Sequence, residues 1–176
     1  MANEKLLVHN PARTHGYNRS RPSKESETCL FCDQENVKKY LIAESTGWIV
    51  RANAYPFIDG AVLIIPKRHI EFVHQTTGEE WLELKEHMDY LAEVWTKHYL
   101  ALDKRTDKIK MMDEDEPSYN YYVNNGPFSG QTQRHLHWHF IPRMYRITTA
   151  MEEIEPFKKV NMTPDDTVAI FKSLDY

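Results

Sequence analysis

The run His135-Leu136-His137-Trp138-His139 constrains the fold of this chain more than any other segment does. Strict alternation of histidine with large apolar residues is the pattern of a β-strand, because successive strand side chains point to opposite faces of a sheet. The apolar set, which continues at Phe140, would face a core. Three imidazoles on the other face serve no packing purpose, since burying them requires polar partners. The run therefore predicts a strand that carries a functional site.

The composition is that of a soluble, folded protein long enough for one domain. Of 176 residues, 41% are hydrophobic and 27% are charged, and the formal net charge is −4. This acidic balance argues against non-specific binding to a phosphate backbone, so no stable nucleic-acid partner is expected. The sequence has neither an apolar run that could span a membrane nor the pattern of a secretory signal at its start, which predicts a cytoplasmic location.

The chain divides into three expected segments. Residues 1–26 are polar and predict an N-terminal extension, and 27–145 carry the strand and helix patterns of a catalytic domain. Residues 146–176 predict a C-terminal tail with a short helix, because Thr163-Pro164 is a strong N-cap signal. The charged stretch 103–118 predicts a solvated loop.

Strand and helix periods alternate within residues 27–145. Apolar residues recur every three or four positions from Trp81 to Leu102, which predicts a long amphipathic helix packed against a core. We therefore expect an α+β domain with a mostly antiparallel sheet and the long helix on one face. The expected strands are Trp48–Ala52, Ala61–Ile65 (ended by Pro66), Tyr119–Val123 and about Arg134–Ile141.

The two cysteines, Cys29 and Cys32, are spaced C-x-x-C. In a reducing compartment such a pair is more often a metal ligand or a redox pair than a structural disulfide. Two thiolates cannot complete a tetrahedral zinc site, so further ligands would come from elsewhere in the chain. Thioredoxin-like chemistry is the weaker alternative, because no parallel βαβ pattern surrounds the cysteines.

The alternating histidines allow two kinds of chemistry. Strand residues two positions apart lie roughly 6.5–7 Å apart at Cα, so three of them on one metal ion would need strained geometry. A neutral imidazole can instead attack phosphorus and form a phosphoramidate bond that water or another acceptor breaks. The loop just upstream supports this reading, because Gly126 and Gly130 would leave backbone amides available to an anion. Its polar donors are Asn124, Ser129, Gln131 and Thr132.

The segment Asn124–Pro142 closely resembles the signature of the histidine-triad (HIT) superfamily, in which a Gly-Gln-Ser/Thr element precedes alternating histidines. Asn53 to His69 resembles the upstream Asn…Gly-His…Pro-Lys-x-His block of that family. With the cysteines, the likeness covers about residues 27–143. It implies a HIT-like fold with about five strands, a small-molecule nucleotide substrate and a homodimer. The run from His135 to Arg143 resembles bacterial members that process dinucleoside polyphosphates.

The resemblance also implies a role for each matching residue. His137 would be the nucleophile that takes up a nucleotidyl group, and His139 would contact the phosphate or assist the leaving group. A structural zinc ion would be held by Cys29, Cys32, His69 and His135, with His87 as the rival of His69. The substrate-binding set would be Asn53, Asn124, Gly130, Gln131 and Thr132.

Two features depart from the family pattern, and three functions stay open. Ala61 stands where many members carry a histidine, and residues 103–118 are longer than the usual connection. The leading hypothesis is a hydrolase that cleaves a dinucleoside polyphosphate, or a related phosphoanhydride or phosphoramidate, through a nucleotidyl-histidine intermediate. One alternative is a nucleotidyltransferase or phosphorylase that uses phosphate or a sugar phosphate as acceptor. The other is a zinc-stabilised nucleotide-binding module without turnover.

Overall fold

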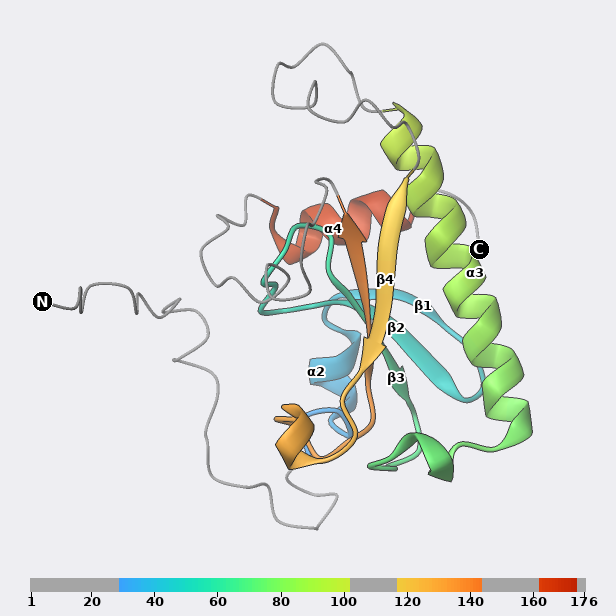
Figure 1. Ribbon diagram of the computed structural model, residues 1–176. Helices are drawn as coiled ribbons and strands as arrows, with labels where there is room; N and C mark the ends of the chain where they lie inside the picture. The colour runs from blue at the N-terminus through green and yellow to red at the C-terminus, as the bar shows by residue number, and fades with distance from the viewer. Residues whose placement is uncertain (1–28, 102–116, 144–161, 174–176) are drawn as a thin grey trace, which may run out of the picture.

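A five-stranded antiparallel sheet forms the centre of the computed structural model, which describes residues 29–101, 117–143 and 162–173 (Figure 1). The strand order is β1-β2-β3-β5-β4, and every neighbouring pair is antiparallel. The predicted α+β class with about five strands is therefore confirmed. The strands are β1 (Leu41–Glu44), β2 (Trp48–Ala52), β3 (Val62–Pro66), β4 (Ser118–Val123) and β5 (Trp138–Arg143).

The two longest helices among the described residues begin next to side-chain N-terminal caps. Thr163 and Asp166 exchange backbone-to-side-chain hydrogen bonds in a capping box, as the N-cap signal before Pro164 predicted. Thr77 and Glu80 form the same reciprocal pair before the long helix. No helix among the described residues is long and apolar enough to cross a membrane. The helical elements are α2 (Gln34–Lys38), η2 (Val73–Gln75), α3 (Gly78–Ala101), η3 (Pro127–Ser129) and α4 (Pro164–Phe171).

One face of the sheet packs against α3 and α4. The predicted apolar stripe of α3 supplies Leu84, Leu91 and Trp95, which are completely buried in the main core cluster. From α4, Phe171 packs edge-to-face on Phe140 of β5, with ring centroids 5.6 Å apart. Burying these apolar side chains is the main term that holds the helices on the sheet.

The opposite face of the sheet packs against α2 and the turn that contains the two cysteines (Figure 1). Ile49, Leu63 and Ile65 point to this side and form a smaller cluster with Val37 of α2. Arg51 lies on the same face, and its Nη1 donates to the carbonyl oxygen of Asn36 at 2.7 Å, which ties β2 to α2. Because Leu63 is the register partner of His139, this face also carries His139.

Strand β5 begins four residues later than the sequence predicted. Its ladder starts at Trp138, which pairs with Ile64 and Val123, whereas Arg134 to His137 lie outside the sheet. The expected strand from Arg134 to Ile141 was therefore wrong at both ends. Near the start of β5, the carbonyl oxygen of Pro66 accepts a hydrogen bond from the side chain of His135. At this point β3 is therefore bonded to a side chain and not to the backbone of β5. At the end of β5, Pro142 is tolerated because the ladder with β3 stops at Phe140.

Several expectations concern residues or properties outside the described parts. Residues 1–28, 102–116, 144–161 and 174–176 lie outside the described residues, and they include the N-terminal extension, most of the charged loop and much of the tail. Among the described strands, β1 and β4 form the two edges of the sheet. The homodimer, the cytoplasmic location and the three-segment division stay predictions.

We expect the packing of α4 to contribute strongly to stability. Replacing Phe171 with Ala should lower the free energy of unfolding by about 3–5 kcal/mol, because it opens a cavity under Phe140. Phe128 is a matched control: it is fully exposed, so Phe128→Ala should change this energy by less than about 0.5 kcal/mol. Urea titrations followed by tryptophan fluorescence measure both, and equal effects of the two variants would contradict the packing assigned to α4.

Candidate functional site

Two cysteines and two histidines from three parts of the chain meet beside the sheet. The amides of Cys32 and Asp33 both donate to the carbonyl of Cys29, so a tight turn brings the two sulfur atoms together. The Nδ1 atom of His69 lies 3.1 Å from the sulfur of Cys32. The Nδ1 atom of His135 lies 3.4 Å and 3.5 Å from the sulfurs of Cys29 and Cys32. All four atoms lie within 4.8 Å of one another.

The geometry of this cluster fits a tetrahedral zinc ion. Bonds of about 2.3 Å to sulfur and about 2.0–2.1 Å to nitrogen place ligand atoms roughly 3.3–3.8 Å apart around one metal. His135 Nε2 donates to the carbonyl oxygen of Pro66 at 2.8 Å, which leaves the Nδ1 lone pair directed at the sulfurs. The rival ligand, His87, lies on α3 and contacts the hydroxyl of Ser45 at 3.0 Å, so the cluster contains His69 instead.

Burial shifts the pKa of two groups in this cluster, Cys32 and His135. It raises the pKa of the Cys32 thiol to about 11, and the neighbouring Cys29 thiol adds to the rise. Burial also lowers the pKa of His135 to about 4, so its imidazole is neutral near neutral pH. A neutral imidazole is ready to ligate a metal, whereas the raised pKa of Cys32 means that its thiol needs a nearby cation to become a thiolate. The donor set therefore favours a cation at its centre.

His137 is buried next to this cluster, and one of its ring nitrogens is fixed. Its Nδ1 lies 2.8 Å from the carbonyl oxygen of His135. A carbonyl only accepts, so Nδ1 carries the proton and Nε2 keeps an unshared electron pair. Burial lowers the pKa of His137, which keeps the ring neutral. Phe31, between the two cysteines, packs on the rings of His135 and His137 with centroids 5.9 Å and 5.1 Å away.

His139 is the triad member that lies within a strand, and it is half-buried. Its ring meets that of His137 edge-on, with centroids 4.9 Å apart. On the neighbouring strand, Tyr122 is its register partner, and the two rings are stacked at 4.6 Å with an interplanar angle of 14°. Phe57 lies on a further side, at 6.4 Å. His137 and His139 are therefore adjacent, as the sequence pattern predicted.

The loop before the histidines is closed by its own hydrogen bonds. Gly126 and Gly130 both have φ of 89°, a left-handed conformation that favours glycine. The amide of Gly126 donates to the side-chain oxygen of Gln131 at 2.6 Å, and that of Gly130 donates to the carbonyl of Pro127 at 3.2 Å. The expectation that these two amides are available to an anion was wrong, because the tight turn uses them internally.

The predicted substrate-binding side chains occupy different settings. The side-chain amide of Gln131 makes two hydrogen bonds that hold the loop. Its oxygen accepts from the backbone amide of Gly126, and its nitrogen donates to the carbonyl of Glu71 at 2.9 Å. Asn124 donates to the hydroxyl of Tyr122 at 3.2 Å, and Thr132 is exposed. Asn53 accepts from the amide of Tyr55 at 3.0 Å, which shapes the turn after β2.

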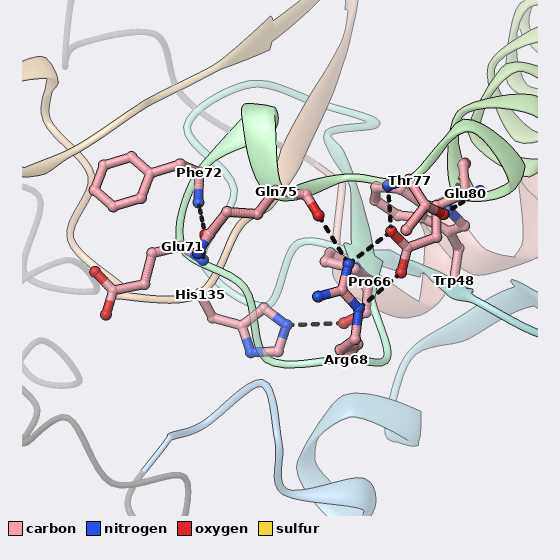
Figure 2. A network of polar contacts seen from close by, with 9 residues as sticks. All are labelled: Trp48, Pro66, Arg68, Glu71, Phe72, Gln75, Thr77, Glu80 and His135. Atoms are coloured by element: carbon pink, nitrogen blue, oxygen red, sulfur yellow. Dashed lines mark hydrogen bonds and ion pairs between the residues drawn. The ribbon is translucent and has the colours of Figure 1, made fainter.

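The segment between β3 and α3, which carries His69, is held by a polar network (Figure 2). Arg68 donates to both carboxylate oxygens of Glu80 and to the carbonyl of Gln75. These contacts lower the pKa of the Glu80 carboxyl below its usual range. Trp48 of β2 donates to the carbonyl of Glu80 at 2.8 Å and joins the network to the sheet. Arg68 therefore holds this segment in place.

Tyr122 and Phe31 are contacts of the histidines that sequence reasoning did not identify. Phe31 could have been noticed, because it lies between the two cysteines that the family resemblance already groups with His135. Tyr122 gave no such signal, since its position opposite His139 depends on the register of β4 and β5.

Comparison with known proteins finds matches to the central part of this chain. The family model for the HIT domain matches residues 34–145. An uncharacterized HIT-like protein of Mycoplasma genitalium is 33% identical over 122 residues, which cover 67% of this chain and 74% of that protein. An adenosine 5′-monophosphoramidase of Candida albicans is 26% identical over 122 residues, which cover 66% of this chain and 70% of that protein.

Solved structures share the fold at low sequence identity. A zinc-bound histidine triad family protein from Mycobacterium smegmatis superposes with a TM-score of 0.55 at 19% identity, over 84% of this chain and 93% of that one. An ADP-glucose phosphorylase from Arabidopsis thaliana superposes with a TM-score of 0.61 at 16% identity, over 84% of this chain and 44% of that one. With the family match over most of the folded region, the chain belongs to the HIT domain family.

Proposed function

We propose that this chain is a nucleotide hydrolase that works through a covalent nucleotidyl intermediate on His137. The observation that carries the proposal is the contact of His137 Nδ1 with the carbonyl of His135 at 2.8 Å. It leaves Nε2 as the nitrogen with an unshared pair, which is the property a phosphorus nucleophile requires. We propose that His139, whose ring lies edge-on to that of His137, assists departure of the leaving group.

The reaction has two displacement steps. His137 Nε2 donates its electron pair to the α-phosphorus, a P–N bond forms, and the bond from phosphorus to the leaving group breaks. The leaving group takes the bonding pair and a proton, for which His139 is the proposed donor. A water molecule then attacks the same phosphorus and gives a proton to His139, which restores the proton lost in the first step. The P–N bond breaks, the electron pair returns to Nε2, and a nucleoside monophosphate is released.

The proposed substrate class is a dinucleoside polyphosphate or a nucleotide phosphoramidate. A monophosphoramidase from Candida albicans at 26% identity supports the phosphoramidate, and the histidine arrangement serves either leaving group. Asn124 and Thr132 are proposed to contact phosphate oxygens, and Asn53 the ribose side of the pocket. For Gly130 and Gln131 we propose a supporting role, because their amide groups already hold the loop.

We also propose that Cys29, Cys32, His69 and His135 hold one structural zinc ion. The support is the donor set, its spacing within 4.8 Å, and the bond from His135 Nε2 to Pro66. When bound, the ion supplies a cross-link between the cysteine turn, the segment after β3 and the entry to β5. Its four ligands complete the tetrahedron, so no open position for a substrate remains.

Metal analysis tests the zinc site. The wild-type chain should contain about one zinc ion, and a Cys29→Ser/Cys32→Ser variant should lose it, because serine hydroxyls are poor zinc ligands. His87→Gln is the matched control, since His87 lies outside the cluster and should leave the zinc content unchanged. Zinc retained by the double variant, measured by inductively coupled plasma mass spectrometry, would contradict the ligand set.

Trapping of the intermediate tests the catalytic residue. Brief reaction with adenosine 5′-monophosphoramidate or diadenosine triphosphate, followed by denaturing quench, should add one adenylyl group to His137. His137→Ala should abolish the adduct and lower kcat/KM by roughly 10³-fold or more, since it removes the nucleophile. His74→Ala, at an exposed histidine outside the site, should keep both. Turnover by His137→Ala at the wild-type rate would contradict the proposed mechanism.

The acceptor is tested separately from the nucleophile. An ADP-glucose phosphorylase shares the fold, so phosphate in place of water is the second candidate. With diadenosine triphosphate in isotopically labelled water, a hydrolase should place the label in AMP whether or not inorganic phosphate is present. A phosphorylase would instead make two molecules of ADP and no AMP, and only when phosphate is present. Mass spectrometry of the products separates the two outcomes.

A further inference from the structure

Tyr122 contacts two residues of the proposed site from a position that no motif includes. Its ring stacks on that of His139, with centroids 4.6 Å apart and planes at 14°. Its hydroxyl accepts a hydrogen bond from Asn124 Nδ2 at 3.2 Å. The residue lies on β4, at the edge of the described sheet, and 39% of its surface is exposed. Tyr122 therefore joins the last histidine of the triad to the loop that precedes the triad.

A purely structural reading would treat Tyr122 as one of the cross-strand pairs that stabilise a sheet. Tyr119 shows what such a residue looks like on the same strand. It is 38% exposed, faces the other side of the sheet and packs on the rings of Tyr121 and Phe140 at 5.6 Å and 5.3 Å. Tyr122 differs because its hydroxyl reaches beyond the sheet to a loop residue. The two tyrosines therefore lie on the same strand and are similarly exposed, but they differ in their contacts.

The ring plane of His139 needs contacts to define it. The second side-chain torsion of histidine is broad and roughly two-fold, so the rotamer alone does not set the direction of the ring nitrogens. The stack with Tyr122 fixes the plane, while His137 meets an edge of the same ring at 4.9 Å and 63°. Without the stack, the His139 ring could turn. Its nitrogen atoms would then point away from the leaving group to which His139 is proposed to give a proton.

The hydroxyl of Tyr122 acts on a different part of the site. A side-chain amide carries two N–H donors, and the bond to Tyr122 uses one of them. This bond sets the plane of the Asn124 amide and hence the direction of its other N–H. In the proposed function, Asn124 contacts a phosphate oxygen. Loss of the hydroxyl would loosen that contact without changing the plane of His139.

We propose that Tyr122 is a positioning residue for nucleotidyl transfer, whose ring sets the plane of His139 and whose hydroxyl sets the amide of Asn124. This inference rests on the proposed function of His137, His139 and Asn124. The ring acts on the chemical step through His139, and the hydroxyl acts on substrate binding through Asn124. The two contributions are therefore separable by substitution.

Kinetics of three full-length variants test the separation, with adenosine 5′-monophosphoramidate and diadenosine triphosphate as probes. Tyr122→Val should lower kcat by roughly three- to tenfold, the size of an aromatic pair interaction. Tyr122→Phe keeps the ring, so kcat should hold while KM rises by roughly two- to tenfold, the size of one hydrogen bond. Tyr119→Val is the matched control and should leave both constants within about twofold.

Nuclear magnetic resonance of the His139 ring gives a readout that does not depend on turnover. The stacked Tyr122 ring should shift the ring protons of His139 upfield in the wild type and in Tyr122→Phe. Tyr122→Val should lose the shift, and Tyr119→Val should keep it. The Asn124 side-chain amide signals should move in Tyr122→Phe and in Tyr122→Val.

Two results would overturn the inference: a Tyr122→Val chain with wild-type kcat and KM, or a His139 ring signal that this substitution leaves unchanged. Failure of the proposed function has a different signature. In that case the wild-type chain would turn over neither probe, or His137→Ala would remain active. The ring and amide signals would still decide whether Tyr122 orients His139 and Asn124. A folded state confirmed for each variant by thermal unfolding excludes collapse of the edge strand as the cause of lost activity.

Discussion

The imidazole of His135 lies between the carbonyl oxygen of Pro66 and the sulfur atoms of Cys29 and Cys32, and the site depends on this placement. The ring is completely buried, and a buried imidazole is costly unless both nitrogens have polar partners. The partners come from the end of β3 and from the cysteine turn, so they fix where those segments meet. The carbonyl of the same residue then accepts from His137. One residue thus sets both the cluster and the tautomer of the proposed nucleophile.

The alternation of β5 transmits the packing of the core to the site. Phe140 points to the α3 and α4 side, where Phe171 packs on it, while its neighbour His139 points to the other side. A shift of β5 that moved Phe140 would move His139 as well. The helices on one face therefore position a histidine on the other, and a rigid strand holds a site more closely than a loop does. β4 is more exposed, and there Tyr122 contributes a contact at the rim.

Features that depend on neighbouring residues could be predicted from the sequence. Features that depend on how distant segments pair could not. The β-branched and apolar runs of β2 and β3, the period of α3 and the cap at Thr163 are properties of neighbouring residues, so they could be predicted. β1 and α2 were missed because neither short segment contains the run of β-branched and aromatic residues that identifies β2 and β3. The alternation that starts at His135 extends beyond the ladder, since a strand pattern does not reveal where its partner ends. The choice of His69 over His87 came from resemblance, and the contact of Tyr122 with His139 follows from register alone.

Ala61 stands where many relatives have a histidine. The contacts of His137 explain why no histidine is needed at this position. Ala61 is buried and offers no side-chain hydrogen bond. The proton on Nδ1 of His137 is held by the backbone carbonyl of His135, so this constraint needs no side chain at position 61. A histidine would titrate within the physiological range, whereas a carbonyl oxygen does not. The tautomer that keeps the Nε2 electron pair unshared is therefore fixed by a group whose hydrogen-bonding capacity stays the same as the pH changes.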